Sequence, residues 1–217
     1  GTDIVIRPGA VNWMTAGRGI VHSERTPDEE RTSGQTMHGL QTWVALPKSH
    51  EGTSPAFEHH PSSTLPEFLH SGARMRVLAG EAYGKTSPVK FPWPILYVAV
   101  EADDGANLIV PETLAEERAL YIVTGQAVID DEAFSEVEML VLAPGVDIAV
   151  RLEPGTKCVL CGGATMDAPR KIEWNFVASD AALIEQAKTD WTAATTTGGT
   201  DRFPRVPGDE AEWIPLP

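Results

Sequence analysis

Short apolar segments separated by turn residues dominate the chain. The segments are rich in Val and Ile, and turns interrupt them at "RPG" (7–9), "TG" (124–125), "APG" (143–145) and "EPG" (153–155). Val and Ile favour extended backbone, and Pro and Gly turns end strands. The pattern therefore predicts an all-β protein, with strands near 3–6, 37–46, 73–79, 95–100, 119–123, 126–130, 138–142, 147–152 and 157–161.

One segment near the C-terminus has the period of a helix instead. Ser179 or Asp180 can cap its first turn, and "DAALIEQAKTDW" then predicts a helix over about 180–192. Its spacing places four apolar side chains on one face, namely Leu183, Ile184, Ala187 and Trp191.

The composition changes after this helix. "TAATTTGGT" at 192–200 predicts a flexible linker. The proline-rich ending 201–217 is expected to pack against the body of the protein, because it carries the large apolar residues Phe203, Trp213, Ile214 and Leu216. At a coarser scale, "IRPGAVNW" (6–13) and "LAPGVDIAV" (142–150) both place a Pro-Gly turn before a strand. This spacing suggests two related β-barrels or sandwiches.

Charge and composition exclude several classes of function. The formal net charge is −14, with no basic run, which argues against binding to nucleic acid or to an anionic membrane surface. The longest apolar runs, such as "PILYVAV" (94–100), are too short to span a bilayer. Two cysteines provide no disulfide framework, so we expect a cytoplasmic protein.

A candidate metal site lies in "WMTAGRGIVHSE" (13–24). Residues two apart on a strand point to the same side, so His22 and Glu24 could bind one metal ion. An imidazole and a carboxylate suit Fe, Mn, Ni or Zn. The alternative is a surface or core histidine beside a solvated glutamate. The small residues of Thr15–Gly19 would let the backbone turn sharply just before the pair.

The blocks around this pair resemble the pirin family, a branch of the cupin superfamily. They are "RPGAVNWMTAGRGIVHSERT", "HGLQTWVAL" (38–46), "GEAYG" (80–84), "WNFVAS" (174–179) and the ending "RFPRVPGDEAEWIPLP". The resemblance implies a bicupin, in which two jelly-roll cupin β-barrels are stacked. It also implies one iron ion in the N-terminal barrel, held by three histidines and a glutamate. Two of those ligands match His22 and Glu24.

The other two family ligands belong to an "HPHRG"-like motif, and no HxH motif occurs in these 217 residues. We therefore expect an N-terminally shortened chain with an incomplete first barrel and weak or no metal binding. The expected domains are residues 1–66 of the first barrel, a metal-free second barrel at 67–165, and a C-terminal segment at 166–217. That segment would hold the helix and a tail that packs back on the barrels.

Three further groups have two interpretations each. Gln41 and Trp43 share one face of a predicted strand, so they either line a substrate cavity or pack in the core. Cys158 and Cys161 have the spacing of a zinc or redox pair. Positions three apart on a strand face opposite sides, however, which favours reduced, buried cysteines. The adjacent "HH" at 59–60 is expected to lie in a solvated loop rather than in a site.

The family resemblance implies two kinds of function. One is oxidative ring opening of a quercetin-like flavonol, with iron as Lewis acid, His22 as ligand, and Glu24 as ligand and general base. The other is a metal- or redox-responsive regulatory protein that acts through contacts with a protein partner. A cupin with an unrelated small-molecule substrate is a third alternative, because a fold does not fix a function.

Overall fold

The computed structural model describes residues 1–34 and 36–217. These residues divide into two compact units. The sandwich unit contains residues 7–13 and 59–165, and the helical unit contains residues 1–6, 14–58 and 166–217. The domain boundaries expected after residues 66 and 165 remain a prediction.

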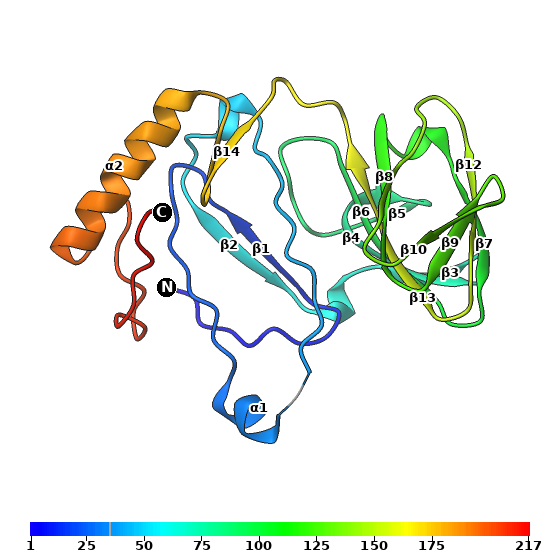
Figure 1. Ribbon diagram of the computed structural model, residues 1–217, viewed down its shortest axis with the longest axis horizontal. Coiled ribbons are helices and arrows are strands. Elements are labelled where there is room, and N and C mark those ends of the chain that lie inside the picture. Colours follow the sequence, from blue (N-terminus) through cyan, green and yellow to red (C-terminus); the bar gives the residue numbers. More distant parts are fainter. Residues whose placement is uncertain (35) are drawn as a thin grey trace. The chain divides into compact units, whose positions relative to one another are not determined.

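Two antiparallel sheets make up the sandwich unit (Figure 1). The larger sheet has the order β11-β8-β13-β6-β4-β3, and β5 pairs with β4. Its strands are β3 (Glu67–His70), β4 (Ala73–Ala82), β5 (Lys85–Thr86), β6 (Ile95–Ala102), β8 (Glu117–Thr124), β11 (Met139–Val141) and β13 (Thr156–Gly163). The smaller sheet, of order β10-β9-β12-β7, contains β7 (Ala106–Val110), β9 (Gln126–Ile129), β10 (Glu132–Ser135) and β12 (Ile148–Leu152).

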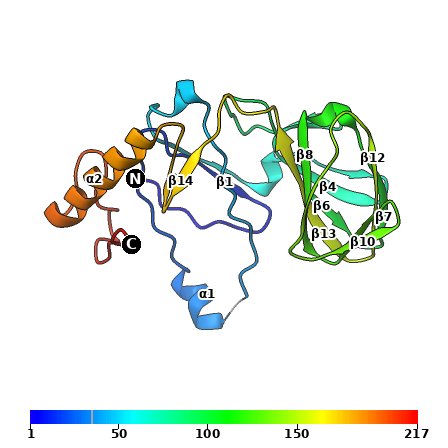
Figure 2. The same ribbon diagram turned by 45° about the horizontal axis from the view of Figure 1, so that its top comes forward.

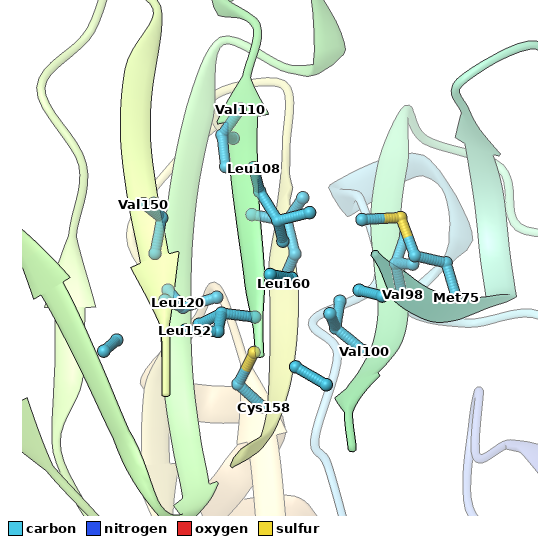
Figure 3. Close-up of a cluster of buried hydrophobic side chains, with 14 of the residues drawn as sticks. Met75, Val98, Val100, Leu108, Val110, Leu120, Val150, Leu152, Cys158 and Leu160 are labelled. Atoms are coloured by element: carbon cyan, nitrogen blue, oxygen red, sulfur yellow. The ribbon is translucent and has the colours of Figure 1, made fainter. Parts of the chain in front are cut away.

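The main hydrophobic core lies between these two sheets. Burial alternates along the strands, so that every second residue of β6 and β7 is buried. Side chains from both sheets meet in this core (Figure 3), including Met75, Val98, Val100, Leu108, Val110, Leu120, Val150, Leu152, Cys158 and Leu160. Alternation of this kind follows from the pleat of a strand, in which successive side chains point to opposite faces.

A second apolar cluster covers the other face of the larger sheet. Val11 and Trp13 pack there beside Ala79 and Val89. The Trp13 ring meets the Phe91 ring edge to face, with 5.7 Å between their centroids. Val11 and Trp13 belong to β1 (Val11–Thr15), which pairs with β2 (Ala56–His60).

The helical unit contains the remaining regular elements. These are α1 (Asp28–Ser33), β14 (Lys171–Glu173), β15 (Phe176–Ala178) and α2 (Ala181–Thr197). The buried guanidinium of Arg170 ties this unit together, because it contacts the carboxylates of Glu51 at 3.0 Å and Asp167 at 2.6 Å. Short 3-10 helices occur at Lys48–His50 here, and at Ser62–Thr64 and Glu112–Leu114 in the sandwich unit.

The all-β class is confirmed, and so are seven of the predicted strands, from 73–79 onward. The strands predicted over 3–6 and 37–46 are wrong, because these residues form no strand. A strand needs a neighbour for its backbone hydrogen bonds, and within the described residues no strand pairs with either segment. The histidines of "HH" are a second correction: they end β2, where His59 Nδ1 lies 2.7 Å from Asn12 Oδ1.

The predicted C-terminal helix is present as α2. The Asp180 carboxylate caps it by accepting a hydrogen bond from the Ala182 amide at 2.9 Å. The linker predicted from residue 192 is wrong, because the helix continues to Thr197. Threonine hydroxyls in this last part donate to carbonyl oxygens four residues earlier, as from Thr196 to Thr192. Gly198, with a φ of +80°, ends the helix.

No helix within the residues that the structure describes combines the length and the apolar character needed to cross a membrane.

The two cysteines are free thiols on opposite faces of β13. Cys158 is buried in the main core, as predicted. Cys161 is only half-buried, which corrects the expectation of two fully buried side chains. Burial raises the pKa of Cys158 to about 12 and also raises the pKa of Cys161. Because the thiolate is the reactive form, both thiols should be inert near neutral pH.

Alkylation of the native protein tests this expectation. We expect iodoacetamide at pH 8 to leave Cys158 unmodified in the folded chain, with slow modification of Cys161, and to modify both rapidly in denaturant. Peptide mass spectrometry would separate the two sites. Rapid native labelling of Cys158 would contradict its place in the core.

Candidate metal centre

His22 and Glu24 lie in a segment of irregular backbone. Residues 20–27 form neither helix nor strand, and both side chains are exposed. The structure therefore corrects the expectation of a pair that projects from a strand into a barrel cavity. The alternation of a strand depends on pairing with a neighbour, and this segment has no such ladder among the described residues.

A tight turn precedes the pair. Gly17 and Gly19 have φ values of +51° and +140°, a region that side chains rarely adopt. A Cβ atom on Gly17 would lie 2.1 Å from the carbonyl oxygen of Thr53, so only glycine fits there. The Arg18 amide donates to the same oxygen at 2.9 Å. The sharp turn expected within Thr15–Gly19 is confirmed, and it fixes the backbone just before His22 and Glu24.

Gln41 is the predicted cavity residue that reaches the pair. Its Nε2 atom donates to Oε1 of Glu24 at 3.4 Å, which is a long and therefore weak hydrogen bond. Trp43 is 51% exposed, so packing in a core, one of its two interpretations, does not hold. Neither residue projects from a strand.

Ser23 and Arg25, which alternate with the predicted ligands, both bind one carboxylate. Arg25 donates to Asp209 through Nε at 2.7 Å and through Nη2 at 3.0 Å, and the side chain of Ser23 hydrogen-bonds the same group. The hydrogen bonds from Arg25 and then from Ser23 hold the pKa of Asp209 below its usual value. Ser23 and Arg25 are therefore anchored to one carboxylate, while the side chains of His22 and Glu24 are exposed.

The donor chemistry of the pair fits iron, but the number of donors is incomplete. An imidazole and a carboxylate are ligands that iron accepts, and both are accessible. Across residues 1–34 and 36–217, no three His, Cys, Asp or Glu side chains gather closely enough to hold a metal ion. Because mononuclear sites usually supply three or more protein ligands, the described residues offer part of a donor set.

Sequence reasoning missed the contacts that hold the segment around His22 and Glu24. Arg25 and Asp209 are 184 positions apart, and nothing in the local pattern connects them. The only hint was compositional: a basic residue directly follows the candidate ligands, and the tail carries Asp209, Glu210 and Glu212.

Family models match both ends of the chain. The model of the pirin C-terminal cupin domain matches residues 97–197, and the model of pirin itself matches residues 1–44, which include His22 and Glu24. These two matches together cover most of the sandwich unit's strands and the candidate metal pair.

Similar proteins agree with these models. A pirin-like protein of Caulobacter vibrioides is 41% identical over the whole chain, which spans 72% of that protein. Human pirin is 31% identical over 87% of the chain, which spans 66% of it. A crystal structure of a quercetin 2,3-dioxygenase from Acinetobacter baumannii superposes on the whole chain with a TM-score of 0.84 and 29% identity, and 69% of that protein is covered. With its cupin fold, the chain belongs to the pirin family.

Proposed function

We propose that the protein is a pirin-type quercetin 2,3-dioxygenase, which opens a flavonol-like small molecule with dioxygen. In this proposal His22 and Glu24 are two ligands of a single iron ion. The name of the Acinetobacter structure supports the reaction class. The observation that carries the site is the anchoring of its backbone: Ser23 and Arg25 bind Asp209, while the imidazole of His22 and the carboxylate of Glu24 stay exposed and accessible to a metal ion.

The proposal takes the remaining ligands from the resemblance to the family. The family resemblance places two histidines in an HxH-type motif upstream of the position matched by Gly1. We call this chain with such a segment in front of it the extended protein. The proposal expects iron binding and turnover in this extended protein.

Each residue of the pair has a distinct role in the reaction. When bound, iron supplies a Lewis acid that lowers the pKa of a substrate hydroxyl. His22 would hold the metal through its imidazole. Glu24 would accept the substrate proton as a general base. The amide of Gln41 lies beside the Glu24 carboxylate and donates a long hydrogen bond to it.

Oxygen uptake tests the proposal. The extended protein, loaded with Fe²⁺ under argon, should consume dioxygen when quercetin is added, and His22→Ala should remove this uptake. Loss of quercetin absorbance should accompany the oxygen signal. An iron-loaded sample that leaves both dioxygen and quercetin unchanged would contradict the assigned reaction.

A further inference from the structure

We infer that the C-terminal tail (residues 201–217) positions the His22–Glu24 segment for metal binding, with Asp209 and Glu212 as its positioning residues. The inference rests on the proposed function, because it assigns the tail a role toward the same two ligands. Neither acidic residue would touch the metal or the substrate.

The tail binds the segment through a network of charged groups. The guanidinium of Arg25 is bidentate to Asp209 and donates from Nη2 to Glu212 at 2.7 Å. Ser23 adds a further hydrogen bond to Asp209. An isolated ion pair at the surface contributes little to stability. A guanidinium that binds one carboxylate through two hydrogen bonds and a second carboxylate through a third holds a conformation better.

The same tail also contacts the turn before the pair. Arg202 donates from Nε to the carbonyl oxygen of Arg18 at 2.7 Å. A Cβ atom on Gly19 would lie 2.8 Å from Cε1 of Phe203, so this backbone lies directly against the phenyl ring. The tail therefore contacts the chain on both sides of His22, at residues 18–19 and at residues 23–25.

Aromatic packing makes the tail itself a fixed support. Phe203 is 3% exposed and packs against Trp191 of α2, with ring centroids 5.4 Å apart. Trp213 packs against the same Trp191 at 5.0 Å. The tail follows α2 in both views (Figures 1 and 2). Ile214, which was expected to be an anchor, is instead 65% exposed.

This support has a physical consequence for the ligands. Residues 20–27 form no ladder of backbone hydrogen bonds with any strand that the structure describes, so side-chain contacts contribute much of what holds their conformation. Loss of outer contacts that orient metal ligands typically weakens metal binding about 10- to 100-fold. Asp209 and Glu212 supply such contacts at Ser23 and Arg25, which are sequence neighbours of the two ligands.

Two readouts on one set of variants test the inference. The double variant Asp209→Asn, Glu212→Gln should speed hydrogen exchange of the amides at 20–27 in the chain described here. In the extended protein it should weaken Co²⁺ binding, measured by calorimetric titration, by about 10-fold. Asp209→Glu keeps the charge and should restore most of the affinity. The matched control is Glu173→Gln, an exposed carboxylate paired with Lys188 in the same unit, which should change neither readout.

Each outcome has one meaning. Faster exchange with unchanged Co²⁺ affinity would overturn the inference, because the tail would then be only a structural support. Unchanged hydrogen exchange would also overturn it, because Asp209 and Glu212 would then not hold residues 20–27. If His22→Ala itself leaves Co²⁺ affinity intact, the proposed metal site fails, whereas a loss in His22→Ala without a loss in the tail variant removes the tail's role alone.

Discussion

Replacing Arg118 with alanine is expected to lower the free energy of unfolding by about 3 kcal/mol or more. Arg118 is only 2% exposed, and its guanidinium donates to three backbone carbonyl oxygens, of Val110 at 3.0 Å, Ala143 at 2.7 Å and Val146 at 2.8 Å. Val110 is the last residue of β7, and Ala143 and Val146 lie in the loop between β11 and β12. Alanine would leave the Val110 oxygen buried without this donor, would remove the donors of two partly buried oxygens, and would open a cavity, and each defect costs stability.

Equilibrium unfolding in urea measures this effect. The matched control is Arg151→Ala, since Arg151 has a side chain that is 54% exposed and pairs with Glu153 at the surface. We expect that control to change stability by less than about 1 kcal/mol. Equally small losses of unfolding free energy in both variants would show that the Arg118 contacts do not stabilise the sandwich unit.

Replacing Glu24 with glutamine should abolish most turnover of quercetin by the iron-loaded extended protein. An amide is isosteric with the carboxylate but cannot accept the substrate proton, so we expect kcat to fall by on the order of 100-fold or more. Iron content should fall less than turnover, because His22 and the other family ligands remain.

Glu29→Gln provides the matched control for this variant. Glu29 is an exposed carboxylate in the first turn of α1, in the same unit as Glu24. Its replacement should leave both turnover and iron content unchanged. A Glu24→Gln protein with the parent's kcat would remove the general-base role and leave Glu24, at most, as a ligand.

The strands of the sandwich unit were predictable because they are short runs rich in Val and Ile that turn residues bound. The buried face of β6 was not visible, because "ILYVAV" is apolar throughout and burial alternates there only in the folded structure. The start of α2 was visible in the sequence, because Asp180 caps it locally. Strands such as β2 and β10 escaped prediction, because "AFEHH" and "EAFS" are too polar or too short to form such a run.

The candidate site was predictable in its residues but not in its surroundings. His22 and Glu24 were identified from their spacing and the blocks around them, which a family model also matches. The contacts that fix the segment depend on Asp209 and Arg202, which lie 184 positions from their partners. Local periodicity carries no information on such pairing, since it arises only when the chain folds.

The metal content of the extended protein tests the assignment of His22 most directly. Protein purified under argon with added Fe²⁺ would be compared by elemental analysis with His22→Ala and with the control His50→Ala. His50 belongs to the same unit and bonds locally to Ser49. We expect a single iron ion per chain in the parent and in His50→Ala, and almost none in His22→Ala, with unchanged circular dichroism. Full iron content in His22→Ala would contradict the proposed metal centre.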